Sequence, residues 1–153
     1  MPTLDDVYRK FGEAAEAAQL LETELGNTLL SIRGTEEGLF AQPEPARASD
    51  LMQAINRHTL GQLLKSIQTK TQVLDELEQL LWDALQARNS LLHSFYRKHN
   101  FRRNSEEGRE VMMKDLHRLH AKLLAAYEAL LRASGVDLNA LAGYPDPTRH
   151  VPI

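Results

Sequence analysis

Cysteine is absent from the 153-residue sequence, which excludes a disulfide framework and any metal site built on thiolates. No run approaches the roughly 18 apolar residues that a membrane helix needs. Residues 1–6 are acidic and lack the apolar core of a signal peptide. The chain also has no glycine-rich phosphate loop, no serine-nucleophile elbow, no zinc-ligand spacing and no Glu-x-x-His pair. We therefore expect a soluble cytoplasmic protein that uses no metal or cofactor.

Helical periodicity dominates what is present, and no sustained alternation of period two predicts a strand. Thr3 and Asp6 have the spacing of an N-cap, and Gly34 is the expected C-terminal stop of this first helix. Apolar and small residues follow a 3-4 spacing through it: Leu4, Val7, Phe11, Ala14, Ala18, Leu21, Leu25, Thr28 and Ile32. The pattern predicts a long amphipathic helix that packs in a bundle or a dimer.

Three further helices are predicted along the chain. The Gly- and Pro-containing residues 35–49 read as a loop, and a helix capped by Ser49 or Asp50 runs to about residue 68, with an interruption at residues 57–58. A central helix begins after Thr69 or Thr71 and continues to about residue 99. After a turn at residues 100–104, Ser105 caps the last helix, which Gly135 closes. Its buried stripe is expected to be Met112, Leu116, Leu119, Leu123, Ala126 and Leu130.

These segments predict an all-α fold, a four- to five-helix up-down bundle with a long first helix and a central helical hairpin. The length fits a single domain. We assign residues 1–135 to that helical domain and residues 136–153, which contain Pro145 and Pro147, to a loop or tail.

The central helix contains a charge where its apolar stripe should be. At about 100° per residue, the following residues fall on one side of the helix together with Arg88: Leu77, Leu81, Ala84, Leu91, Leu92 and Phe95. A buried charge is unfavourable unless it is paired. Asn89, His93 and Tyr96 line a flank of this stripe. Arg88 is therefore either a site residue beside an imidazole or one half of an ion pair with a carboxylate on another helix, and His93 is alternatively a polar residue at a helix interface.

Arg88-Asn89-Ser90-Leu91-Leu92-His93 fits the pattern R-N-x-x-x-H and resembles the motif of HEPN domains. The resemblance implies an all-α bundle whose two central helices carry the motif. Many members of that family are metal-independent endoribonucleases of toxin–antitoxin, phage-defence and CRISPR-associated systems, and a symmetric dimer brings two Arg/His pairs into one cleft. A nucleotidyltransferase or another antitoxin is then a possible partner. Toxins that pair with a nucleotidyltransferase often have tyrosine two positions after the histidine, where this chain has Phe95, with Tyr96 one later.

The residue types suit RNA cleavage. Histidine can remove the proton of a ribose 2′-hydroxyl, and an always-charged arginine can stabilise the phosphorane. We therefore assign catalysis to His93 and Arg88, with Asn89 orienting the pair and Tyr96 as an accessory residue. In a regular α-helix Arg88 and His93 would lie about 140° apart and about 7.5 Å along the axis. They would then meet on one phosphate more easily across a homodimer than within one chain.

Charge supports an anion site near this motif. The net charge is −3, yet residues 88–109 carry six Lys or Arg against Glu106 and Glu107, which is +4 locally and leaves −7 elsewhere. The RNA-binding candidates are Arg97, Lys98, Arg102 and Arg103. They could instead solvate a helix end, where basic residues are favoured.

Three other histidines have simpler interpretations. His99 is expected to cap its helix end. His117 and His120 have a spacing that could hold a metal, but we expect them to face solvent.

Two alternatives to a ribonuclease stay open: a non-catalytic HEPN-like module that binds a nucleotide, RNA or a protein, and a structural helical adaptor that uses the seam of the first helix.

Overall fold

A computed structural model describes residues 1–39, 41, 42, 44–59, 61–63, 65 and 75–133, and these residues form helices and turns without a strand. The helices are α1 (Leu4–Glu36), α2 (Pro45–Asn56), α4 (Asp75–Asn89), α5 (Phe95–His99) and α6 (Glu106–Ala133). A π-helical segment, η1 (Ser90–Ser94), joins α4 to α5, and a 3-10 segment, η2 (Asn100–Asn104), follows α5. The predicted all-α helical bundle is confirmed.

Helix α1 begins where the sequence predicted and ends one turn later than predicted. Thr3 accepts a hydrogen bond from the backbone N–H of Asp6, whose carboxylate accepts one from the backbone N–H of Thr3. At the other end the N–H groups of Gly38 and Leu39 donate to the carbonyls of Thr35 and Gly34, at 3.2 and 2.9 Å. This is a Schellman motif, and Gly38 occupies its left-handed position with φ 70°. The assignment of that role to Gly34 was wrong, because Gly34 lies within the last turn.

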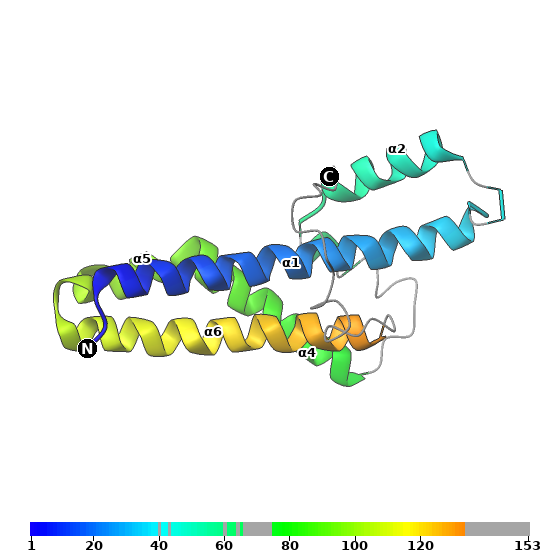
Figure 1. Cartoon of the computed structure of the whole chain (residues 1–153). Helices are drawn as coiled ribbons and strands as arrows, with labels where there is room; N and C mark the ends of the chain where they lie inside the picture. The colour runs from blue at the N-terminus through cyan, green and yellow to red at the C-terminus, as the bar shows by residue number, and fades with distance from the viewer. Residues whose placement is uncertain (40, 43, 60, 64, 66–74, 134–153) are drawn as a thin grey trace, which may run out of the picture.

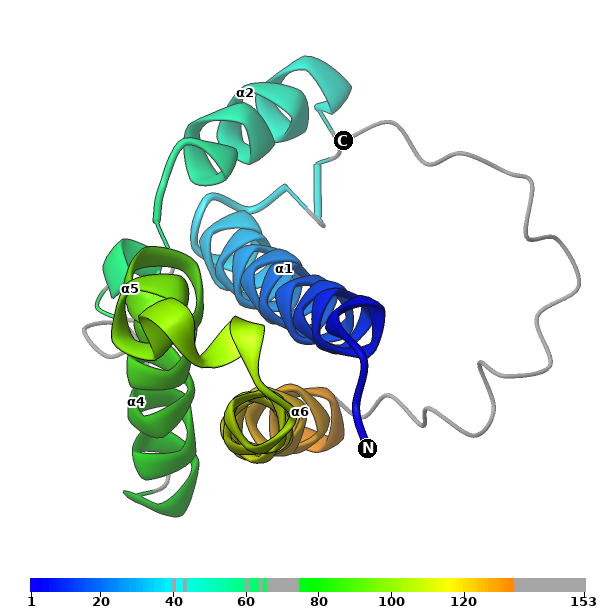
Figure 2. The same cartoon turned by 90° about the vertical axis from the view of Figure 1, so that its left-hand side faces the viewer.

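Helices α1, α4 and α6 enclose the core. Helices α1 and α6 lie side by side and run in the same direction, whereas α4 and α5 run the opposite way (Figures 1 and 2). The predicted antiparallel pairing of the central and last helices is therefore present. All six predicted stripe residues of α6 are buried, and they meet a matching row on α1 that comprises Val7, Ala14, Ala17, Ala18, Leu21, Leu25 and Leu29.

Helix α2 lies along the second half of α1 (Figure 1), with buried Ile55 against Gly26. It begins at Pro45, so the prediction that the helix starts at Ser49 or Asp50 was wrong. Pro45 occupies the first helical position, where the missing N–H has no intrahelical partner to lose. The predicted interruption is present: α2 ends at Asn56, and Thr59 and Gln62 exchange capping hydrogen bonds. The predictions at Thr69, Thr71, Gly135 and residues 136–153 lie outside the described residues.

The central helix is not a regular α-helix. Its π turn at Ser90–Ser94 moves the following residues around the axis, so that Leu91 and Phe95 are buried while Leu92 is 42 % exposed. The prediction that Leu92 belongs to the buried stripe was wrong for this reason.

The connection from α5 to α6 is tight. Asn100 takes a positive φ of 38°, which a non-glycine residue rarely adopts. The carbonyl of Arg102 lies so close to Gly108 that a Cβ there would be 2.1 Å from its oxygen. Ser105 caps α6 as predicted and accepts a hydrogen bond from the N–H of Gly108 at 3.0 Å.

Among the described helices, none combines the length and apolar character that a membrane span requires.

Candidate functional site

Arg88 is the centre of a four-residue cluster at the junction of α4 and η1. Its Nε donates to the Glu22 carboxylate of α1 at 3.0 Å, and its Nη1 donates to Asn89 Oδ1 at 3.2 Å. The same Nη1 lies 3.2 Å from His93 Nε2. The Arg88 side chain is 19 % exposed and that of Glu22 is 30 % exposed. Arg88 is therefore both half of an ion pair between helices and a neighbour of an imidazole.

The contact between Arg88 and His93 fixes how the imidazole is protonated. A guanidinium can only donate hydrogen bonds, so His93 Nε2 must be the acceptor and carry no hydrogen. The ring hydrogen then sits on Nδ1. His93 is exposed, and its Nε2 lone pair faces the guanidinium of Arg88.

The π turn explains why these two residues meet within one chain. Adding a residue to one helical turn brings residues five apart onto the same side of the helix. The expectation that a regular α-helix keeps Arg88 and His93 apart within one chain was therefore wrong. The homodimer stays a prediction that rests on the family resemblance alone.

Tyr96 lies away from the cluster, in an aromatic group between α1 and α5. Its ring centroid is 5.1 Å from that of Phe11, 5.2 Å from that of Phe95 and 6.4 Å from that of Tyr8. Burial, and then the neighbouring Tyr8, raise the pKa of Tyr96 above its ordinary value. No hydrogen bond joins Tyr96 to Arg88 or His93 in the described part of the chain, so the structure does not bring this accessory residue to the predicted pair.

The four predicted RNA-binding residues are exposed on α5 and η2, and each also has an internal partner. Arg97 donates to the carbonyl of His93 at 2.6 Å. The partners of the other three are Asp115 for Lys98, His99 for Arg102 and the Tyr8 hydroxyl for Arg103. Because each arginine has five donor hydrogens, these contacts leave donors for an anion. The cations stand at the end of the molecule where α5 ends and α6 begins (Figure 1).

His99 does not cap its helix, contrary to the prediction. Its side chain is 1 % exposed, and Nε2 lies 2.9 Å from Asp115 Oδ2 while Nδ1 lies 3.0 Å from Arg102 Nη1. Because Arg102 can only donate, Nδ1 is the acceptor and Nε2 donates to Asp115. Burial opposes the charge of Asp115, but the hydrogen bonds from Lys98, Arg118 and His99 outweigh it and hold the pKa of that carboxyl well below its usual range. This network ties α5 to α6.

His120 does not face solvent as predicted, because it lies against α1. Its Nδ1 accepts from Lys10 Nζ at 2.8 Å, and Lys10 also donates to Glu13 at 2.9 Å. Burial and the ammonium of Lys10 lower the pKa of His120. Within the part of the chain that the structure describes, no three His, Cys, Asp or Glu side chains gather as a metal site.

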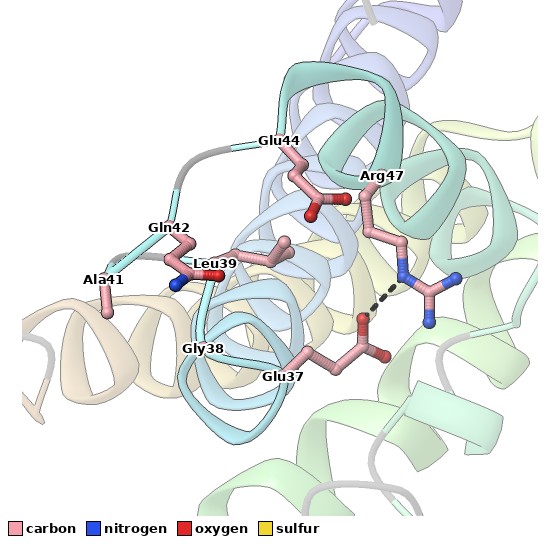
Figure 3. Close-up of a pocket in the computed structure, with 7 residues that line it drawn as sticks. All are labelled: Glu37, Gly38, Leu39, Ala41, Gln42, Glu44 and Arg47. Atoms are coloured by element: carbon pink, nitrogen blue, oxygen red, sulfur yellow. Dashed lines mark hydrogen bonds and ion pairs between the residues drawn. The ribbon is translucent and has the colours of Figure 1, made fainter.

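A separate hollow of about 480 Å³ lies where α1 ends and α2 begins (Figure 3). The described residues that line it are Glu37, Gly38, Leu39, Ala41, Gln42, Glu44 and Arg47. Glu37 and Arg47 face one another across it and form an ion pair of 2.9 Å. The described lining of the hollow has no imidazole beside its guanidinium, whereas the cluster around Arg88 has one, so that cluster is the better candidate site.

Glu22 is the cluster residue that sequence reasoning did not name. The possibility of a carboxylate partner for Arg88 followed from the cost of a buried charge, but Glu22 is 66 positions away and no local pattern selects it. The one sequence feature that could have indicated Glu22 is its place beside Leu21 and Leu25 on the predicted seam of α1.

No family model, no curated protein and no solved structure matches the chain.

Proposed function

We propose that the protein is a metal-independent endoribonuclease of HEPN type, with Arg88 and His93 as its catalytic residues. The observation that carries the proposal is the 3.2 Å contact between Arg88 Nη1 and His93 Nε2, held by Glu22 and Asn89. A fixed cation and an unprotonated imidazole nitrogen at one point are what transfer of a phosphoryl group to a ribose hydroxyl requires. The match of these residues to the pattern R-N-x-x-x-H supports the same function.

The chemistry begins with an exchange of partners. An RNA phosphate attracts the guanidinium of Arg88, which leaves His93 Nε2 and donates to a phosphoryl oxygen. Nε2 then accepts the proton of the ribose 2′-hydroxyl, whose oxygen bonds to phosphorus while the P–O5′ bond breaks. The leaving O5′ takes a proton from a general acid, and the products are a 2′,3′-cyclic phosphate and a 5′-hydroxyl end. Asn89 and Glu22 hold Arg88 in place as positioning residues.

A homodimer would supply that general acid. In a two-fold arrangement like that of HEPN proteins, His93 of the partner subunit would stand on the other side of the scissile phosphate as the acid. Arg97, Lys98, Arg102 and Arg103 would gather the RNA backbone. Such an enzyme suits a toxin or a defence effector in the cytoplasm, controlled by an antitoxin or a nucleotidyltransferase partner.

The test is cleavage of labelled single-stranded RNA by purified protein in the presence of EDTA. We expect 2′,3′-cyclic phosphate ends, and we expect Arg88→Ala and His93→Ala each to lower the rate by about 100-fold or more. Arg47→Ala is the control, because Arg47 also forms an ion pair with a glutamate at the C-terminal cap of α1 but lies at the hollow between α1 and α2. Intact RNA with the wild-type protein, or cleavage that survives both site substitutions, would contradict the proposal.

The ion pair with Glu22 favours a second candidate, a non-catalytic HEPN-like module or helical adaptor in which Arg88 joins α1 to α4. In that case Arg88→Ala and Glu22→Ala would lower the free energy of unfolding by similar amounts, of about 1–3 kcal/mol given their partial exposure. Catalysis predicts a different outcome, in which Arg88→Ala abolishes cleavage while the thermal midpoint falls only slightly. Urea unfolding and the cleavage assay on the same variants separate the two.

A further inference from the structure

Two exposed tyrosine rings, Tyr8 on α1 and Tyr96 on α5, lie next to each other. Tyr8 is 43 % exposed and Tyr96 is 39 % exposed, although the described residues bury most other large apolar side chains of these segments. Their ring centroids are 6.4 Å apart, with the ring planes at 57°. Together they present an aromatic surface to solvent.

This surface is rigidly supported from below. The ring of Phe11 lies 5.1 Å from that of Tyr96, and the ring of Phe95, which is 1 % exposed, meets Tyr96 edge-on at 5.2 Å. Phe11 and Phe95 also contact each other at 5.7 Å. Rings packed against other aromatic rings lose little conformational freedom when a flat ligand stacks on them.

Positive charge borders the same surface. The guanidinium of Arg103 donates to the Tyr8 hydroxyl at 2.7 Å, and its carbon lies 5.9 Å from the Tyr8 ring centroid. Arg97, one residue after Tyr96, is exposed too. Tyr96 itself is uncharged at neutral pH, because the ordinary tyrosine pKa lies near 10 and burial raises that of Tyr96 further. An aromatic surface with arginines beside it suits a flat base that carries a phosphate, and alternation of stacking rings and cations is typical of single-stranded nucleic-acid sites.

We propose that Tyr8 and Tyr96, with Arg103, form a nucleobase-stacking subsite for unpaired bases of single-stranded RNA. The proposal rests on the ribonuclease function proposed above and names its substrate class. Tyr96 comes three residues after His93, and Arg97, the residue next to Tyr96, donates to the carbonyl of His93. A base stacked on Tyr96 therefore belongs to a neighbouring nucleotide rather than to the one at His93. Duplex RNA, whose bases are paired and stacked on each other, cannot use the subsite.

The test measures binding of a fluorescent 2′-O-methyl oligoadenylate by anisotropy at low salt. Blocking the 2′-hydroxyl removes the nucleophile, so binding is measured whether or not the protein cleaves RNA. We expect the double variant Tyr8→Leu/Tyr96→Leu to bind about 5- to 150-fold more weakly, the range expected for loss of one stacked base. The matched control Tyr8→Phe/Tyr96→Phe keeps both rings and should retain most of the affinity. A 2′-O-methyl duplex should bind the wild-type protein more weakly than the single strand.

A second measurement guards against misfolding of the leucine variant. Wild-type protein irradiated with an oligonucleotide that contains 5-iodouridine should crosslink in the peptides that hold Tyr8 or Tyr96. Equal affinity of the wild-type and leucine variants, equal affinity for duplex, absence of binding, or crosslinks confined to other peptides would each overturn the subsite. RNA cleavage that needs Arg88 and His93 would then leave the ribonuclease function standing. Stacking without cleavage would retain the subsite and refute the ribonuclease.

Discussion

Asp115 offers the sharpest test of what holds α5 onto α6. It accepts hydrogen bonds from Lys98, His99 and Arg118. Lys98 and Arg118 are more than half exposed, so each is worth only about 0.2–1 kcal/mol. His99 is 1 % exposed, and its N–H would lack a partner without Asp115, at a cost of about 1–3 kcal/mol. We therefore expect Asp115→Ala to lower the free energy of unfolding by about 2–4 kcal/mol.

Asp115→Asn is the matched variant, because the amide oxygen can still accept from His99. We expect it to lower the free energy of unfolding by only about 1 kcal/mol, mainly through the weakened exposed pairs. Urea unfolding followed by circular dichroism at neutral pH measures both variants. For a chain of this length the alanine variant should also melt about 5–15 °C lower. If alanine and asparagine are equally destabilising, the buried bond to His99 is not what stabilises this junction, and the reasoning fails.

The pH dependence of the unfolding free energy of wild type and of Asp115→Asn provides an independent check. The pKa of Asp115 is lower in the folded protein than the ordinary aspartate value near 3.9. A carboxyl of this kind adds stability above its unfolded pKa, and that stability is lost as the pH falls toward the folded pKa. The difference in unfolding free energy between wild type and Asp115→Asn should therefore shrink below about pH 4. A difference that grows with acidity would contradict the assignment.

Three further perturbations follow from local geometry. Gly108→Ala should lower the free energy of unfolding by about 2 kcal/mol or more, because its Cβ would meet the backbone oxygen of Arg102. Thermal unfolding measures this change, and an unchanged midpoint would contradict it. Thr3→Ala should reduce the free energy of unfolding by about 1 kcal/mol through loss of the helix cap, whereas Thr3→Asp should not. Lys10→Met should raise the pKa of His120 while burial still keeps it below its ordinary value; a ring-proton NMR titration that shows no rise would exclude the contact.

Local chemistry made much of the fold predictable. The caps at Thr3 and Ser105 follow from side chains that bond backbone groups a few residues away, and the stripe of α6 follows from spacing alone. Errors arose where two local signals competed. Gly34 and Gly38 both suit a helix end, and only the closing hydrogen bonds select Gly38. Pro45 suits both a loop and a first helical position.

The candidate site was less predictable, since its geometry depends on a change of helical pitch. The sequence identified Arg88, Asn89 and His93 as site residues. An assumed rotation of 100° per residue, however, placed Arg88 and His93 on different sides of the helix. Ser90–Ser94 contains no glycine or proline to signal the π turn. Glu22 and Tyr8 come from another helix, and their pairing with Arg88 and Tyr96 depends on how α1 docks against α4 and α5.

The parallel run of α1 beside α6 has a consequence for synthesis on the ribosome. The apolar row of α1 emerges before α6, its main partner, which is translated roughly a hundred residues later, as the bond from Arg109 to the carbonyl of Pro2 illustrates. Contacts this distant in sequence delay folding. Until α6 is made, the exposed apolar face of α1 can bind other nascent chains or chaperones. Truncation before α6 should therefore yield a chaperone-bound or aggregated polypeptide rather than a smaller stable bundle.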